Sequence, residues 1–131
     1  MGQYLSSPVT DKEIVAGEAE HVLGRIDYAV ASHQGWRRSQ EDAHVAVQLT
    51  NEHLLFGVYD GRGGHEVAHF CSLVMPKELP TLKSFLEEDY ARSLITVFHL
   101  MDEKLRQGEE HGDGNRANRE LFIVYWGEKE A

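Results

Sequence analysis

The chain has 131 residues, enough for one ordinary domain, and 41% of them are hydrophobic, which suffices to build a core. It carries 22 acidic against 13 basic residues, for a formal net charge of −9, and this balance argues against nucleic acid as a partner because phosphate binding needs clustered cations. The single cysteine, Cys71, excludes an internal disulfide, and no stretch approaches the roughly 20 apolar residues of a membrane span.

The first 24 residues are polar and are interrupted by Pro8, Gly17 and Gly24, which predicts an irregular N-terminal arm over residues 1–24. The start of this arm fits the N-myristoylation pattern, in which removal of Met1 exposes Gly2 and a serine, Ser6, stands at the required spacing. A chance match is the alternative, because the pattern demands only these two residues after Met1. No secretory signal is recognisable, so we expect a cytoplasmic protein, and one that associates weakly with membranes if Gly2 is myristoylated.

Strand-like patterns follow the arm. Apolar residues alternate over 26–33 and again over 45–49, and the run over 54–59 is short and almost continuously apolar, as in a buried strand. Asn51-Glu52 stands between the last two segments and is typical of a turn. We therefore expect a hairpin in a sheet with one covered face.

Two helices are expected after the strands. Glycines at 61–64 end the last strand, and a helix is expected to begin near Gly64 and to end before Pro76. A longer helix is expected to open at Pro80 and Thr81, because apolar residues then recur at spacings of three and four. The members of this apolar face are Leu82, Phe85, Leu86, Leu94, Val97, Phe98, Met101 and Leu105.

The last segment, residues 107–131, is left unassigned by these patterns. Its polar, glycine-containing part over 108–118 is expected to be flexible. The apolar run Leu121–Trp126 fits either a strand or a helix end, and both remain open. The expected organisation is thus an arm over 1–24, a folded region over 25–106 and a tail over 107–131.

Two polar clusters stand where strands are expected to end. The first, over 35–44, joins two arginines to Glu41 and Asp42, and in the second Asp60 ends a buried strand and is followed by Gly61. A hard divalent cation needs oxygen ligands, and an aspartate followed by glycine allows a side chain and a backbone carbonyl to reach one ion together. Acids beside glycine are also common in ordinary turns, so each cluster alone is modest evidence for a metal site.

The motifs of these clusters follow one another in an order and spacing typical of one protein family. The segments over 32–37, 41–44, 56–61 and 63–68 resemble the protein phosphatase 2C family in order and spacing, and the resemblance extends from the N-terminus to about Leu105. It implies an α/β fold of α+β layers, an antiparallel β-sandwich flanked by helices. Residues 25–106 would be an incomplete, N-terminal portion of that catalytic domain.

The resemblance also implies roles for individual positions. Two Mg²⁺ or Mn²⁺ ions would bind, with Asp60 bridging them, Gly61 offering its backbone carbonyl, and Glu41 and Asp42 holding metal-bound waters. Arg37 would grip the substrate phosphate through its planar, multi-donor guanidinium. The implied reaction is hydrolysis of phosphoserine or phosphothreonine in protein substrates by a water that the two metal ions activate.

Two departures from the family pattern bear on activity. Arg62 replaces the family's proton-donor histidine, and because arginine keeps its proton near neutral pH, a contribution of about 10²–10⁴ in rate would be lost. The family's remaining metal-binding aspartates would lie beyond Ala131. We therefore expect a truncated chain that is weakly active or inactive alone, unless a partner chain completes the fold. A non-catalytic pseudophosphatase that binds phosphoproteins is the alternative.

A competing motif overlaps the last of these segments. The sequence from His65 through Glu66 to His69 fits H-E-x-x-H, the zinc metalloprotease signature, with His99 or His111 as the nominal third ligand. The phosphatase resemblance accounts for every residue of this motif except His69. A zinc protease therefore remains the more remote alternative.

Overall fold

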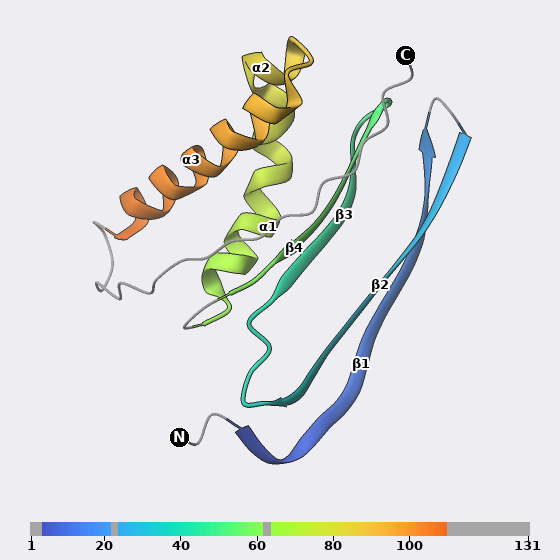
Figure 1. The fold of residues 1–131 in the computed structure, drawn as a ribbon, viewed down its shortest axis with the longest axis vertical. Helices are drawn as coiled ribbons and strands as arrows, with labels where there is room; N and C mark the ends of the chain where they lie inside the picture. Colours follow the sequence, from blue (N-terminus) through green and yellow to red (C-terminus); the bar gives the residue numbers. More distant parts are fainter. Residues whose placement is uncertain (1–3, 22–23, 62–63, 110–131) are drawn as a thin grey trace.

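The computed structural model describes residues 4–21, 24–61 and 64–109 (Figure 1). The elements follow one another as β1 (Tyr4–His21), β2 (Gly24–Arg37), β3 (Ala43–Thr50), β4 (His53–Tyr59), α1 (Glu66–Glu78), a 3-10 turn η1 (Leu79–Thr81), α2 (Lys83–Leu86) and α3 (Tyr90–Glu109). The four strands form two separate antiparallel pairs, β1 with β2 and β3 with β4. The expected strands and the expected turn between β3 and β4 are confirmed.

The β3–β4 hairpin carries the core of the protein. Leu55 and Tyr59 on β4 are fully buried, and they lie on the same face of the strand because side chains alternate with a period of two. Helix α1 packs on this face, and α3 packs against α1, so that the hairpin and the helices share one hydrophobic cluster. Its buried members are Leu55, Tyr59, Ala68, Cys71, Met75, Leu79, Phe85, Val97 and Met101.

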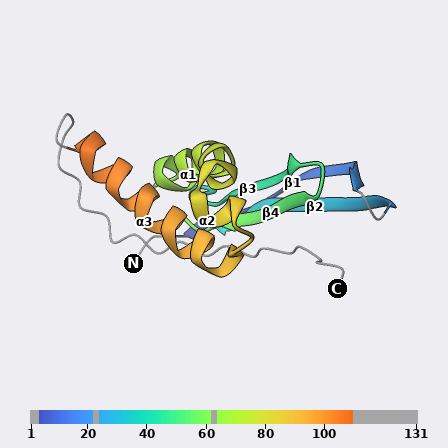
Figure 2. The same ribbon diagram turned by 90° about the horizontal axis from the view of Figure 1, so that it is seen from above.

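The β1–β2 hairpin forms an outer layer on the other face of β3–β4, so the order of layers is helices, β3–β4 and β1–β2 (Figure 2). Tyr28 on β2 meets Phe56 on β4 edge to face, with ring centroids 5.5 Å apart. The Gln48 side chain donates a hydrogen bond of 2.9 Å to the Glu20 carbonyl and joins β3 to β1. The layered α/β architecture with antiparallel strands is therefore confirmed as an incomplete version of the expected fold.

The prediction of an irregular arm over residues 1–24 is wrong, because most of this segment is strand β1. From Lys12 onward β1 pairs residue by residue with β2, and the register shifts are confined to the stretch around Pro8. Gly17 does not break the strand, since it makes room for the ring of Tyr28 opposite: a Cβ on Gly17 would lie 2.4 Å from the Tyr28 hydroxyl. Gly24, the first residue of β2, has a φ of 128°, which glycine adopts readily.

The two expected helices also differ from the sequence prediction. The first, α1, continues through Pro76 to Glu78. A proline in a helix interior removes one hydrogen bond, and burial of Met75 and Leu79 on either side offsets that loss. The helical apolar pattern therefore extends past the proline.

The second expected helix is broken into α2 and α3. Glu88 adopts a φ of +60°, which no residue inside a helix has. Asp89 then precedes α3 and accepts a hydrogen bond from the backbone N–H of Arg92 at 3.2 Å, as an N-terminal cap does. Leu86, predicted on the apolar face, is 73% exposed because the break turns it outward.

Two predictions concern membrane association and the ends of the chain. No helix in the described part of the chain is long and apolar enough to cross a membrane. Gly2 and the unassigned tail from residue 110 onward, including the apolar run 121–126, lie outside the described residues. The boundaries of the expected folded region therefore remain predictions.

Candidate active site

The register of the β3–β4 hairpin brings two predicted site residues together. The last strand pair joins Ala43 to Tyr59, so Asp42, just before β3, and Asp60, just after β4, emerge from the same end of the hairpin. Their carboxyl groups are close enough to share a hydrogen bond when one of them is protonated. The two aspartates, 18 positions apart in the sequence, thus form one acidic pair.

The surroundings of the acidic pair raise the pKa of Asp42 above its ordinary value. Partial burial raises the pKa of the Asp42 carboxyl, and the charge of Asp60 and the hydrogen bond with it raise this pKa further. A hydrogen bond from the backbone N–H of Gly61 and the positive charge of Arg37 act in the opposite direction, but they do not outweigh the first group of effects. A cation between the carboxylates would relieve the repulsion that raises the Asp42 pKa.

Gly61 packs directly under the loop that holds the acids. It is buried, and a Cβ at this position would lie 2.2 Å from the carbonyl oxygen of Glu41 and 2.7 Å from that of Gly64. Any side chain would therefore push the loop before β3 away from the end of β4. Glycine at this position is required by close backbone approach, which is the property that brings Asp42 and Asp60 together.

Arg37 stands at the end of β2 beside the acidic loop. Its side chain is 58% exposed, and its guanidinium lies 3.9 Å from a carboxylate oxygen of Glu41. The other oxygen of Glu41 accepts a hydrogen bond from Ser39 at 3.2 Å. The long and exposed contact with Glu41 leaves most of the guanidinium donors of Arg37 open to an incoming anion.

One residue of the site escaped the sequence analysis. Gln40 donates hydrogen bonds to the Ser32 hydroxyl at 2.9 Å and to the His33 carbonyl at 3.2 Å, and its side-chain oxygen accepts from the backbone N–H of Asp42 at 3.4 Å. Gln40 therefore ties the end of β2 to the acidic loop. Neither periodicity nor a residue-type motif singles out a loop glutamine, so no sequence signal could have found it.

The donors at this site fit a hard divalent cation in type but are few. Carboxylates of Asp42 and Asp60 and the carbonyl of Gly61 are oxygen ligands of the class that Mg²⁺ and Mn²⁺ prefer. Glu41 is near but engages Arg37 and Ser39. Within the described ranges, no three side chains of the His, Cys, Asp or Glu type converge to hold a metal ion. The predicted site residues Arg62 and Gly2 lie outside those ranges.

The H-E-x-x-H motif occupies the start of α1. The backbone N–H of His69 donates to the carbonyl of His65 at 2.9 Å, so the two histidines are one helical turn apart. Both histidines and Glu66 are exposed. His99, nominated as a third ligand, lies on α3 and lines a different hollow between α1 and α3, and His111 lies outside the described residues. The third ligand of a zinc protease is therefore not found among the residues that the structure covers.

Comparison with known proteins gives a consistent result. The family model for protein phosphatase 2C matches residues 26–126. The chain is 36% identical over 125 residues to "Probable protein phosphatase 2C 21" of Arabidopsis thaliana, an alignment that covers 95% of this chain and 32% of that protein. It is 35% identical over 132 residues to "Probable protein phosphatase 2C 4" of Paramecium tetraurelia, which covers 100% of this chain and 40% of that protein.

A second Paramecium tetraurelia protein, "Protein phosphatase 2C 1", is 37% identical over 117 residues, covering 88% of this chain and 38% of that protein. The chain thus spans between 32% and 40% of the length of these curated relatives.

Proposed function

The chain belongs to the protein phosphatase 2C family, and from that premise we propose that it carries the metal-binding and phosphate-binding corner of a metal-dependent protein serine/threonine phosphatase. The observation that carries the proposal is the acidic pair of Asp42 and Asp60, which the β3–β4 register brings together beside Arg37. The substrates would be proteins that bear phosphoserine or phosphothreonine.

Each residue of this corner has a task that follows from its surroundings. Asp60 and Asp42, with the Gly61 carbonyl, would hold Mg²⁺ or Mn²⁺. Burial is the largest cause of the raised Asp42 pKa, and the nearby charge of Asp60 adds to it. Activation of water at neutral pH and stabilisation of charge on the phosphate are the chemistry that such ions supply when bound. Glu41, held by Ser39 and close to Arg37, would orient the guanidinium and water at the rim of the site.

Phosphate recognition is assigned to Arg37. Its guanidinium is largely exposed and points toward the acidic loop closely enough to lower the pKa of Asp42. A planar fork of N–H donors matches the oxygens of a phosphate. Arg37 would therefore hold the phosphate of the substrate against the site where the cations bind.

Turnover by this chain alone is expected to be weak. A hard divalent cation takes about six or more oxygen ligands, and the described residues offer two carboxylates and one carbonyl. Arg62 further removes the proton donor that the family has at that position. A non-catalytic phosphoprotein-binding role is the second candidate. It is favoured because Arg37 is exposed beside a site that has few metal ligands among the described residues.

One experiment tests the proposal and separates the two candidates. The 131-residue chain would be assayed with Mn²⁺ for phosphate release from p-nitrophenyl phosphate and from a phosphothreonine peptide, and binding of that peptide would be titrated in parallel. Arg37→Gln is expected to abolish peptide binding, whereas Arg38→Gln, a neighbouring exposed arginine, should leave it nearly unchanged. Mn²⁺-dependent release that Asp60→Asn abolishes would establish catalysis.

The variant Arg62→His sharpens the assay. If the acids present suffice for metal binding, it should raise turnover by as much as about 10²–10⁴ because it restores a proton donor. Peptide binding without turnover in every variant would assign the non-catalytic role. Absence of both binding and Mn²⁺-dependent release in the unmodified chain would overturn the proposed function.

A further inference from the structure

The two histidines of the H-E-x-x-H motif share one face of the first turn of α1. A backbone hydrogen bond of 2.9 Å from His69 to His65 closes this turn, and residues four apart on a helix lie one above the other. His65 is in the right-handed helical region, with φ −90° and ψ −10°, although it precedes the helix. Its side chain is 68% exposed, and that of His69 is also exposed. Both imidazoles are therefore accessible to an ion from solvent.

Glu66 folds back toward His65. One of its carboxylate oxygens lies 3.9 Å from Nδ1 of His65. The other lies where a Cβ of Gly64 would stand, 2.2 Å from that position, so the absence of a side chain at Gly64 makes room for it. The contact with Nδ1 is longer than a hydrogen bond, so Glu66 lies beside the imidazole without fixing which ring nitrogen carries the proton, and either nitrogen can serve as the electron-pair donor.

We propose that His65 and His69 form a binding site for a late first-row transition-metal ion, with Zn²⁺ or Cu²⁺ bridging the first turn of α1. Neutral imidazole prefers these ions to Mg²⁺ and Mn²⁺, which take oxygen ligands. Glu66 lies beside His65 and is not a ligand. Water completes the coordination, since no third side chain of a metal-binding type joins the pair in the described part of the chain.

This site differs in kind from the acidic pair of Asp42 and Asp60. The acidic pair offers oxygen ligands at the end of the β3–β4 hairpin, whereas the histidine pair offers nitrogen ligands at the start of α1. The two sites therefore select different cations, and the histidine site does not depend on any phosphatase activity. It also differs from a catalytic zinc site, which has a third protein ligand, because no third side chain of a metal-binding type joins the pair among the described residues.

Zinc binding tests the proposal. Equilibrium dialysis of the 131-residue chain against Zn²⁺, in excess Mg²⁺ and in an Asp60→Asn background, isolates the histidine site from the acidic pair. We expect one Zn²⁺ per chain and a rise in Tm on zinc addition, because an ion that binds only the folded state stabilises it. His65→Ala or His69→Ala alone should weaken zinc binding by roughly tenfold or more, since each removes half of the protein ligands.

Matched controls use exposed histidines elsewhere. His33→Ala on β2 and His99→Ala on α3 should leave zinc binding unchanged. Cu²⁺ should bind more tightly than Zn²⁺, and Mg²⁺ should not compete. Zinc binding that survives both single substitutions within twofold, or that is absent from the unmodified chain, overturns the proposal. A Glu66→Gln variant as weak as the histidine variants would make the carboxylate a direct ligand and would also overturn it.

All these substitutions are at exposed positions, where effects on the free energy of unfolding are typically within about 0.5 kcal/mol. Circular dichroism and Tm without metal would verify that each variant folds. A variant that loses zinc binding with an unchanged metal-free Tm supports the proposal.

Discussion

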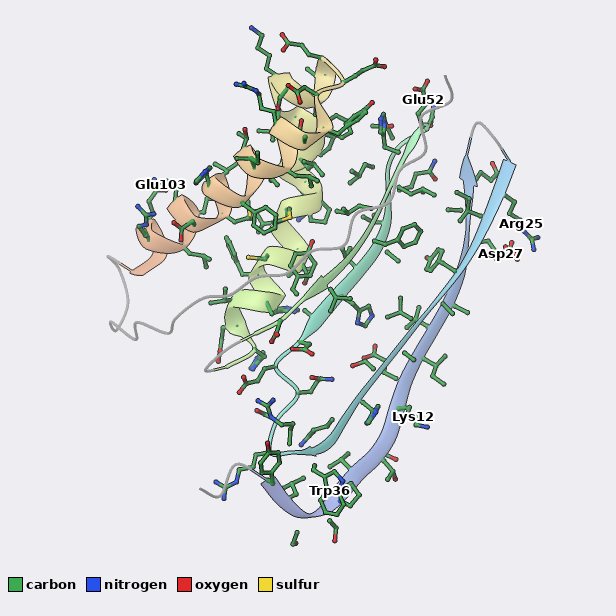
Figure 3. All side chains as sticks on the ribbon, viewed as in Figure 1. Lys12, Arg25, Asp27, Trp36, Glu52 and Glu103 are labelled. Atoms are coloured by element: carbon green, nitrogen blue, oxygen red, sulfur yellow. The ribbon has the colours of Figure 1, made fainter. Side chains whose placement is uncertain are left out.

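The two hairpins of this protein have the same antiparallel geometry but very different surroundings. The β3–β4 hairpin has helices packed on one face, and Leu55 and Tyr59 on it are fully buried. Of the described residues of β1 and β2, whose outer side bears Arg25 and Asp27 (Figure 3), none is buried. Strand pairing alone thus does not make a core. The main stabilisation of the folded state comes from apolar surface that is removed from water.

This difference divides the candidate site. Asp42 and Asp60 are anchored to the helix-backed hairpin, so their separation is held by the core. Arg37 ends β2, which belongs to the exposed hairpin, and Trp36 beside it lies at the same end (Figure 3). The acidic pair is therefore the more firmly anchored half of the candidate site, whereas the position of Arg37 depends on the outer layer and on the hydrogen bonds of Gln40.

The largest expected effect comes from truncating a side chain in the helix-backed layer. Leu55→Ala is expected to lower the free energy of unfolding by about 2–5 kcal/mol, because it leaves a cavity in the core. The matched change Ile14→Ala on β1, where the side chain is 67% exposed, should change it by no more than about 0.5 kcal/mol. Urea denaturation followed by circular dichroism would measure both, and equal losses would contradict the division into core and outer layer.

Gly61→Ala should have the next largest effect. Its Cβ would lie 2.2 Å from the Glu41 carbonyl, so we expect a loss of about 1–3 kcal/mol as the loop shifts. Gly108→Ala is the control, because nothing lies within 4 Å of a Cβ there and alanine in α3 should stabilise the helix by up to about 1 kcal/mol. Changes of opposite sign in the free energy of unfolding, measured by urea denaturation, would confirm that Gly61 is required for close backbone approach. No change on Gly61→Ala would refute it.

The buried hydroxyl of Tyr59 predicts a loss of stability at alkaline pH. Burial, and secondarily the neighbouring Cys71, raises the pKa of Tyr59 well above its ordinary value of 10.0. The folded protein therefore keeps a proton that the unfolded chain loses, and this contribution is complete below pH 10 and declines above it. We expect the decline to approach about 1.4 kcal/mol per pH unit above 10.

The control for this pH dependence is Tyr59→Phe, which keeps the ring and removes the ionisable group. Tm measured across the alkaline range should fall less steeply in this variant than in the unmodified chain. Parallel curves would show that another group sets the alkaline limit.

The smallest effect is expected on the outer hairpin. Arg25 on β2 lies 2.8 Å from Asp27 and 3.3 Å from Glu18, and all three side chains are exposed. Exposed ion pairs typically contribute about 0–1 kcal/mol and weaken with salt. Arg25→Gln should therefore lower stability by less than the changes above, with the difference vanishing at high ionic strength. A loss comparable to that of Leu55→Ala would mean that the outer hairpin is as important to the fold as the core.

The sequence located the elements in which burial of one face makes the apolar residues recur at a regular spacing. Strands β2 to β4 and helix α1 were located because one face of each is at least half-buried and its apolar residues recur at the matching spacing. Strand β1 has no buried face, so its sequence has no alternation and it was mistaken for an irregular arm. The break between α2 and α3 was missed because the apolar spacing continues across Glu88 and only its positive φ and the Asp89 cap reveal it.

For the candidate site, the sequence by itself determined the family and the residues worth naming, since the motifs around Arg37, Asp42 and Asp60 are local runs. Only the tertiary structure decided which of them meet. The β3–β4 register pairs Ala43 with Tyr59 and so brings the adjacent Asp42 and Asp60 together. Close packing at Gly61 holds them there, and Gln40 joins their loop to β2. The physical reason is that a residue's type and local spacing are written along the chain, whereas contacts between strand ends depend on which register buries the most apolar surface.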